Sequence, residues 1–387
     1  MRRSSPATDR VRSALDRALE LGEIGVQVAV YLHGELLVDL AAGVREPGGR
    51  PVDTETLFPV LSVSKAIAAT AVHLQAERGL LDYHRPVADY WPDFGINGKD
   101  RITVAHVLAH QSGIPQMPDG VTPERMCDWD WMVAEIEQLT PHFSPGTANA
   151  YQSIVYGWLL GELVRRTDPF ARDFGRFVRE ELCEPLSVDD VWVGLPAEHD
   201  WRVATLVSGR AEQAGEETPL SRAAKPNVVD IGPPLYNRPE IWRACLPGTG
   251  AIMNARSGAR LFALLACGGE LDGKRLLSPA RIRSFTRLRS HSDTPDLVLL
   301  GGGRVRPPIG VGGYWLGGSP MGGGPGVLSH GGGTTSSTFV DIDRGLSVAI
   351  CQNRCFASTP PGADPPFAAL ASTIHAIVAE STGVVGP

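Results

Sequence analysis

The chain has 387 residues, which is long enough for two or three domains or for one enzyme with an inserted domain. With 43% apolar and 20% charged residues, its composition is typical of a globular protein and excludes a disordered or fibrous one. The formal net charge of −7, without any basic run, argues against a nucleic-acid partner and leaves a small neutral or anionic substrate open.

The N-terminal residues 1–23 lack the apolar core of a secretory signal, and no segment offers about 18 uninterrupted apolar residues. We therefore expect a cytoplasmic protein that does not associate with a membrane. The six cysteines lack paired C-x-x-C spacing, which favours buried thiols over disulfides. Composition does not indicate the oligomeric state.

The first predicted elements are a helix and a pair of strands. Residues 8–23 have the spacing of an amphipathic helix, and residues 26–44 form two apolar runs around His33-Gly34, which suits a β-hairpin. After a polar turn region, residues 62–79 are rich in alanine and stop at Gly79, as a buried helix with a C-terminal glycine does.

The rest of the chain changes from helical to strand-like patterns. From about 80 to 240, short helical patterns alternate with Pro-rich and Gly-rich loops. An apolar helix is predicted over 257–269, and the glycine-rich stretch 301–335 predicts loop and strand. Two strand-like runs within 336–353 are joined by Asp343-Arg344-Gly345, a hairpin signal, and a final apolar helix follows.

These elements predict an α/β (α+β) fold in two parts. Both chain ends, 1–75 and 236–387, are expected to form an antiparallel sheet flanked by helices. Residues 76–235 are expected to form a mainly helical domain. An enzyme built in this way would carry its active site in the cleft between the two parts.

Ser62 and Lys65 stand three residues apart at the start of the predicted helix, so their side chains share one helical face. A serine hydroxyl is a weak nucleophile until a neighbour takes its proton; a desolvated lysine can do this, whereas arginine stays protonated. The chain has 32 Arg and only four Lys. A lysine in an apolar helix of such a chain is therefore a candidate for a function that arginine cannot serve. We predict Ser62 as nucleophile and Lys65 as base, although S-x-x-K alone also fits a surface lysine.

Tyr151 is the second candidate, in Tyr151-Gln152-Ser153 just before an apolar helical run. Its phenol could relay the proton between Ser62, Lys65 and the leaving group. A tyrosine before a helix also fits a core or capping residue.

The third candidate is the run from Ser329 to Gly333, which precedes a predicted strand. Backbone without side chains could lie flat against a substrate there, and the amides of Gly333 and Ser62 would form an oxyanion hole. Read alone, such a glycine run also fits a flexible loop.

In this order and at these separations, the three motifs resemble the serine β-lactamase-like, or penicillin-binding-protein-like, family, which includes class C β-lactamases, D-alanyl-D-alanine carboxypeptidases, family VIII carboxylesterases and related acyltransferases. Ser62-Val63-Ser64-Lys65 resembles the S-x-x-K box of this family. Tyr151-Gln152-Ser153 resembles its Y-x-N box, and His330-Gly331-Gly332 resembles the H-x-G sequence that many members carry in place of K-T-G. The resemblance covers most of the chain and implies that Ser153, His330, Gly331 and Gly332 bind the substrate.

Two departures from the family pattern bear on the substrate. Ser153 stands where Asn is usual, and His330 replaces the Lys that in β-lactamases helps hold the substrate carboxylate. Both favour ester substrates or acyl transfer over efficient β-lactam hydrolysis. The resemblance implies a serine acyl-enzyme hydrolase or acyltransferase, of carboxylesterase or transesterase type. The alternatives are an amide-forming transacylase of a biosynthetic pathway, a β-lactamase or D-aminoacyl peptidase, and a non-catalytic binding scaffold.

No pattern indicates a metal or a cofactor. The ten histidines form neither H-E-x-x-H nor a Cys/His cluster. The sequences G-x-S-x-G and G-x-G-x-x-G after a strand do not occur. We expect catalysis by side chains alone, with a small-molecule ester or amide as substrate and an amine or alcohol as the acceptor if the enzyme transfers acyl groups.

Overall fold

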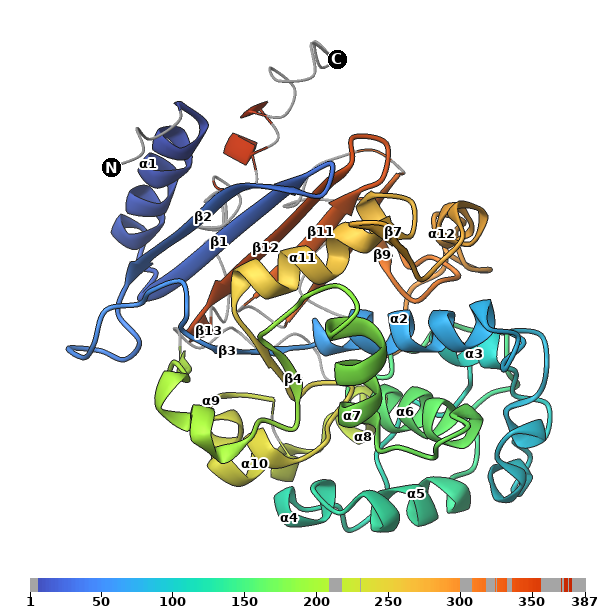
Figure 1. Cartoon of the computed structure of the whole chain (residues 1–387). Coiled ribbons are helices and arrows are strands. Elements are labelled where there is room, and N and C mark those ends of the chain that lie inside the picture. The colour runs from blue at the N-terminus through green and yellow to red at the C-terminus, as the bar shows by residue number, and fades with distance from the viewer. Residues whose placement is uncertain are drawn as a thin grey trace.

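The computed structural model describes residues 6–208, 218–229, 231–299, 308–317, 324, 326–332, 336–355, 370, 372–374 and 376–377. Its largest sheet is antiparallel and six-stranded and combines strands from both ends of the chain (Figure 1). In spatial order the strands are β2 (Glu35–Gly43), β1 (Gly25–Leu32), β12 (Leu346–Gln352), β11 (Ser337–Asp341), β10 (Val327–Gly331) and β9 (Trp315–Leu316). The predicted antiparallel sheet is therefore confirmed.

Different helices cover the two faces of this sheet. Along β1, Val28 and Val30 pack with helix α1 (Pro6–Glu20), whereas Ala29 between them belongs to the larger core. Successive side chains of a strand point to opposite faces, so α1 lies on one face. Helix α11 (Ala255–Ala266) lies across the other, against β1, β11 and β12 (Figure 1).

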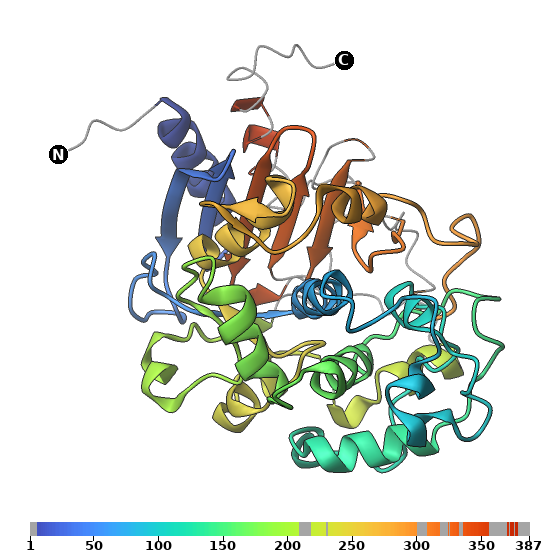
Figure 2. The ribbon, with the colours of Figure 1, turned by 45° about the vertical axis from the view of Figure 1, so that its right-hand side comes forward.

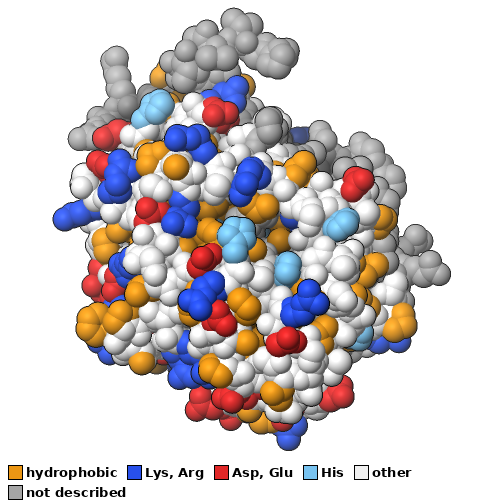
Figure 3. All heavy atoms as spheres, turned by 90° about the vertical axis from the view of Figure 1, so that its right-hand side faces the viewer, with side chains coloured by type: hydrophobic (Ala, Val, Ile, Leu, Met, Phe, Trp, Pro, Cys, Tyr) orange, Lys and Arg blue, Asp and Glu red, His pale blue; other side chains and the backbone are white. Residues whose placement is uncertain are grey.

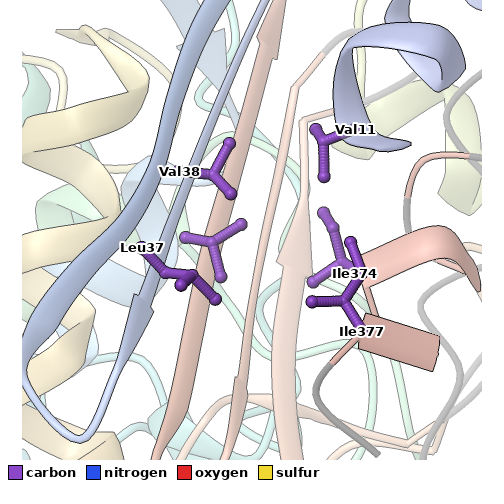
Figure 4. Close-up of a pocket in the computed structure, with 6 residues that line it drawn as sticks. Val11, Leu37, Val38, Ile374 and Ile377 are labelled. Carbon is purple, nitrogen blue, oxygen red and sulfur yellow. The ribbon is translucent and has the colours of Figure 1, made fainter. Parts of the chain in front are cut away.

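On the α1 face, an apolar gap separates α1 from Ile374 and Ile377 near the C-terminus. Figure 4 shows the aliphatic side chains that line it, which are Val11, Val30, Leu37, Val38, Ile374 and Ile377. Because none of these side chains carries a polar group, the gap belongs to the apolar core and is not a candidate for a catalytic site.

Both predicted hairpins are present. His33 and Gly34, with φ of 51° and 82°, form the turn between β1 and β2. Positive φ at both central residues is the type I′ geometry that matches the twist of paired strands. Gly345, with φ of 64°, lies in the turn between β11 and β12.

Shorter strands connect the middle of the chain to its ends. They are β3 (Phe58–Leu61), β6 (Ala251–Met253) and β4 (Val191–Val193) in one sheet, the parallel pair β5 (Val207–Ser208) and β13 (Arg354–Cys355), and the hairpin of β7 (Glu270–Leu271) and β8 (Lys274–Arg275). The segment 76–235 thus contributes β4 and β5 to pairings with the chain ends. The boundaries of the two expected domains stay a prediction.

Most remaining helices lie below the large sheet in Figure 1, and Figure 2 shows α2 between the sheet and these helices. The helices are α2 (Ser64–Glu77), α3 (Val104–Leu108), α4 (Pro123–Met126), α5 (Trp129–Gln138), α6 (Tyr156–Thr167), α7 (Phe174–Val178), α8 (Pro219–Ala224), α9 (Pro233–Tyr236), α10 (Pro239–Arg243) and α12 (Pro279–Phe285). Helix α2 is the buried helix predicted over 62–79. It begins at Ser64, so Ser62 lies in the turn between β3 and α2.

No helix in the described ranges is both long enough and apolar enough to cross a bilayer. On the face drawn in Figure 3, Lys and Arg side chains are interspersed with Asp and Glu.

Lys99 is one of the four lysines of the chain and caps the C-terminal end of helix α5. Its buried ammonium donates to the carbonyl oxygens of Ile96 at 2.9 Å, of Glu137 at 2.7 Å and of Leu139. The last two lie at the C-terminal end of α5, where helix carbonyls have no intrahelical donor. Lys99 therefore caps α5 with all three of its N–H groups.

We expect Lys99→Met to lower the free energy of unfolding by about 3 kcal/mol, because buried carbonyls lose their donor. The same change at the exposed Lys274 should cost less than about 0.5 kcal/mol. Urea unfolding of the two variants checks this. Equal stability of both would mean that the capping contacts contribute nothing.

Candidate active site

The side chains of Ser62 and Lys65 meet as predicted. The Lys65 Nζ lies 3.0 Å from the Ser62 Oγ. Lys65 is fully buried, and Ser62 is 8% exposed. The hydroxyl is therefore at the edge of the interior, with the amine behind it.

Two carbonyl oxygens complete the surroundings of the amine. The Lys65 Nζ donates to the oxygen of Ser153 at 2.7 Å and to that of Gly248 at 2.9 Å. Desolvation by burial lowers the pKa of Lys65 to about 7. When the amine is neutral, its two N–H groups satisfy the two carbonyls, and its lone pair faces the Ser62 hydroxyl.

The turn that presents Ser62 is strained and held from below. Leu61, the last residue of β3, has a φ of 47°, a conformation that costs a non-glycine residue about 1–2 kcal/mol. The Ser64 hydroxyl donates to the Leu61 carbonyl and accepts from the Ala251 amide at 2.8 Å. Ser64 thus ties the turn to β6, and strain at such a turn is typical of functional sites.

Gly248 reaches Lys65 because two glycines let the backbone approach closely. A Cβ on Gly157 in α6 would lie 2.0 Å from the Gly248 nitrogen. A Cβ on Gly248 would lie 2.8 Å from the Ile154 carbonyl oxygen. The loop before β6 can therefore lie directly on α6 only with glycine at both positions.

Tyr151 lies beside this pair, with its ring centroid 5.2 Å from the Lys65 Nζ. Its backbone amide donates to the Oδ1 of Asp296 at 2.9 Å. Asp296 in turn pairs with the buried Arg289 at 3.2 Å, and Arg289 donates to the Ala109 carbonyl at 2.8 Å. The segment that carries the phenol is thus anchored to residues far away in the sequence.

His110 supports the same segment from the other side. Its Nδ1 accepts from the Gln152 amide at 3.1 Å, and its carbonyl accepts from the Ala150 amide at 3.0 Å. Its ring is 4.6 Å from that of Tyr151 and stacks on Tyr156 at 4.3 Å. Burial lowers the pKa of His110 well below its usual value, so the ring is neutral.

His330 lies on β10 with 1% of its surface exposed. Its ring stacks on Trp315 at 5.0 Å, and its Nδ1 donates to the Gly331 carbonyl at 3.1 Å. Burial, and then the charge of Lys65, lower the pKa of His330 to about 3. Gly331 and Gly332 follow it, and the predicted oxyanion residue Gly333 lies outside the described residues.

The structure brings Ser62, Lys65, Tyr151 and Ser153 together. Ser153 accepts from Lys65 through its backbone carbonyl, so this contact does not depend on the type of side chain at position 153. Sequence reasoning missed Gly248, Asp296 and the bracing role of His110. Gly248 and Asp296 stand in loops without a distinctive pattern. In the described part of the chain, no group of His, Cys, Asp and Glu side chains is arranged to hold a metal ion.

A buried lysine against a serine hydroxyl, on an antiparallel sheet with a helical layer, is the arrangement of a serine hydrolase of the β-lactamase type. A family model described as Beta-lactamase matches residues 11–373. The chain belongs to the Beta-lactamase family.

Individual relatives agree with this. Esterase/beta-lactamase LipL of Mycobacterium tuberculosis is 31% identical over 347 residues, which cover 85% of this chain and 77% of that protein. A penicillin-binding protein homologue from Caulobacter crescentus is 33% identical, with a TM-score of 0.85, over 96% of this chain and 98% of its own. A family VIII carboxylesterase is 31% identical, with a TM-score of 0.84 and the same coverage. The predicted family, fold class and hydrolase function are confirmed.

We expect Ser64→Ala to slow acyl-enzyme formation and to lower the free energy of unfolding by about 2 kcal/mol, since the buried Ala251 amide loses its acceptor. Ser13→Ala, on the exposed side of α1, is the matched control. Stopped-flow ester cleavage and urea unfolding measure the two effects. A Ser64→Ala variant with unchanged kinetics would show that the turn keeps its shape without this contact.

Proposed function

We propose that the protein is a carboxylesterase-type enzyme that forms an acyl-enzyme on Ser62. The observation that carries this proposal is the Lys65 amine, which lies 3.0 Å from the Ser62 hydroxyl. Burial lowers its pKa to about 7, so the neutral form is accessible near neutral pH. A base of this kind can take the serine proton as the oxygen attacks an ester carbonyl.

Lys65 and Tyr151 share the proton in this mechanism. Lys65 takes it from Ser62, and the Tyr151 phenol passes it to the leaving oxygen when the tetrahedral intermediate collapses. The Tyr151 ring lies beside the amine, with its centroid 5.2 Å from the Lys65 Nζ, which supports a role for Tyr151 next to this pair. Water then attacks the acyl-enzyme, and the proton returns along the same path.

The proposed oxyanion hole is formed by the amides of Ser62 and Gly333. Gly333 is assigned from the sequence motif alone. His330, Gly331, Gly332 and Ser153 are proposed to line the substrate site next to it. The position of His330 on β10, stacked on Trp315, supports a place in the wall of the site.

We propose a substrate without a carboxylate at this wall. A neutral His330 ring, with its pKa lowered to about 3, offers no positive charge to an anion. Its Nδ1–H is directed at the Gly331 carbonyl, so its Nε2 can only accept a hydrogen bond. A neutral ester suits such a site better than a β-lactam, whose carboxylate needs a cation.

Acyl transfer is the second candidate, in which an amine or alcohol replaces water. The enclosed position of Ser62, 8% exposed, favours it because limited water access lengthens the life of an acyl-enzyme. A cytoplasmic location remains a prediction.

The assignment of Ser62 and Lys65 can be tested by mass spectrometry. We expect a fluorophosphonate to add its mass to the wild type and not to Ser62→Ala. Lys65→Arg should react about 1,000-fold more slowly, because an arginine keeps its proton. Lys274→Arg, at an exposed site, should label at the wild-type rate. Fast labelling of Lys65→Arg would contradict the role of Lys65 as base.

The pH dependence tests the same amine. Because only the neutral form of Lys65 accepts a proton, kcat/KM should rise with pH through about 7 and fall about tenfold per unit at lower pH. Initial rates of ester hydrolysis by pH-stat titration between pH 5 and 9 give the profile, and circular dichroism confirms the fold at each pH. A flat profile across pH 6 to 8 would exclude Lys65 as the titrating base.

A further inference from the structure

Trp315, on the edge strand β9, contacts the rings of two residues of the proposed site. Its ring stacks on that of His330, with the centroids 5.0 Å and the planes 28° apart. Its centroid lies 6.3 Å from that of Tyr151. In the register of the sheet, Trp315 pairs with Ser329, the neighbour of His330 on β10. The indole therefore belongs to the same wall as His330.

The segment before β9 is held against α2, the helix that carries Lys65. The Tyr314 hydroxyl lies 2.8 Å from the Thr70 Oγ1 on α2, and the His73 Nε2 on the same helix donates to the Gly312 carbonyl at 2.9 Å. Tyr314 belongs to the large core, whereas Trp315 packs against the smaller cluster that contains Tyr151. The indole is thus fixed relative to α2 and directed away from the large core.

The indole covers one face of a fully buried imidazole. Trp315 itself is only partly buried, so it separates this face of His330 from solvent. The His330 Nδ1–H is directed at the Gly331 carbonyl, and the buried Nε2 has no hydrogen-bond partner among the described residues. A charged imidazole carries a proton on both nitrogens. A proton on Nε2 would have no acceptor, so the ring stays neutral while water is excluded.

We infer that Trp315 determines which substrate charge the enzyme accepts, because its indole keeps water away from His330. The inference rests on the proposed function, in which His330 lines the substrate site. With the indole in place, the wall is uncharged and suits a neutral substrate. Without the indole, water reaches Nε2, and the protonated ring attracts a carboxylate. Trp315 acts through His330, so it is a specificity-determining residue and not a catalytic one.

The groups that face His330 from other elements do not replace this effect. Trp315 on β9 and Thr338, its partner on β11, do not titrate. His110, in the loop after α3, is buried and neutral. Lys65 on α2 carries a charge that lowers the pKa of His330, but burial is the larger cause. Removal of the indole therefore removes the larger cause and leaves the Lys65 charge in place.

NMR of the protein labelled at the histidine Cε1 carbons tests the exclusion of water without any need for activity. The signal of His330 is assigned as the one that His330→Gln removes. We expect it not to titrate between pH 5 and 8 in the wild type. In Trp315→Leu it should titrate with a midpoint of about 6, because a solvated imidazole titrates near 6.5 and the Lys65 charge lowers this value.

Two further variants are the controls for this titration. Trp315→Phe keeps an aromatic face over the imidazole, so His330 should stay neutral as in the wild type. Trp201→Leu makes the same replacement as Trp315→Leu at a side chain that is 62% exposed, and it should also leave His330 neutral. Circular dichroism confirms the fold of each variant, and Trp315→Met takes the place of Trp315→Leu if the latter does not fold.

A matched pair of esters tests the preference for charge. Mono-p-nitrophenyl adipate ends in a carboxylate, and p-nitrophenyl 6-methylheptanoate has two methyl groups in place of the carboxylate oxygens. In Trp315→Leu, the ratio of kcat/KM for the anionic to the neutral ester should rise about tenfold from pH 8 to about pH 5.5, mainly through KM. Lys65 titrates equally for both esters, so the ratio cancels its effect. The ratio should stay constant in the wild type, in Trp315→Phe and in Trp315→Leu/His330→Gln.

A wild-type His330 that titrates near pH 6 would overturn the inference, and so would a His330 that stays neutral at pH 5 in Trp315→Leu. A constant ratio of the two esters in Trp315→Leu, with a titrating His330, would also overturn it, because the imidazole would then not meet the substrate. Absence of an acyl-enzyme on wild-type Ser62 by intact mass would refute the proposed function itself. That outcome is distinguishable, since the NMR titration does not depend on activity.

Discussion

The burial of one amine determines how three distant segments are arranged. Lys65 on α2 is enclosed by the Ser153 carbonyl, from the turn before α6, and the Gly248 carbonyl, from the loop before β6. An ammonium without such acceptors would be very costly in the interior. The close Gly157–Gly248 contact and the bracing of the Tyr151 segment by Asp296 follow from the need to keep these acceptors in place.

The contrast between Lys65 and Lys99 shows how one residue type serves two purposes. Lys99 donates all three N–H groups to carbonyl oxygens, which cannot give up a proton. Among the described residues, Lys65 contacts two carbonyl oxygens, and its third partner is the Ser62 hydroxyl, which can give up a proton. Lys65 is also the more strongly perturbed, since its pKa falls to about 7 while that of Lys99 falls to about 8. The identity of the third acceptor separates a base from a structural cap.

Local patterns predicted much of this molecule. The 3.6-residue period, the alanine content and Gly79 predicted α2. The spacing predicted that the Ser62 and Lys65 side chains meet, and they do so although Ser62 lies in the turn before the helix. Gly248 and Asp296 could not be predicted, because their roles depend on backbone groups brought together by the whole fold. The strained Leu61 was also invisible, since nothing in a leucine signals a positive φ. Helix α2 begins at Ser64, two residues later than predicted, and the residues between Leu61 and Ser64 form the turn that leaves β3.

Two elements far apart in the sequence hold the segment that carries Tyr151. Asp296 accepts from the Tyr151 amide at 2.9 Å. Helix α8 contributes Ala224 to the buried cluster that contains Ala150 and Tyr151, and the Met117 amide donates to the Ala223 carbonyl of the same helix at 2.9 Å. Because a packed interior transmits displacements, a shift of either element moves the Tyr151 segment as well.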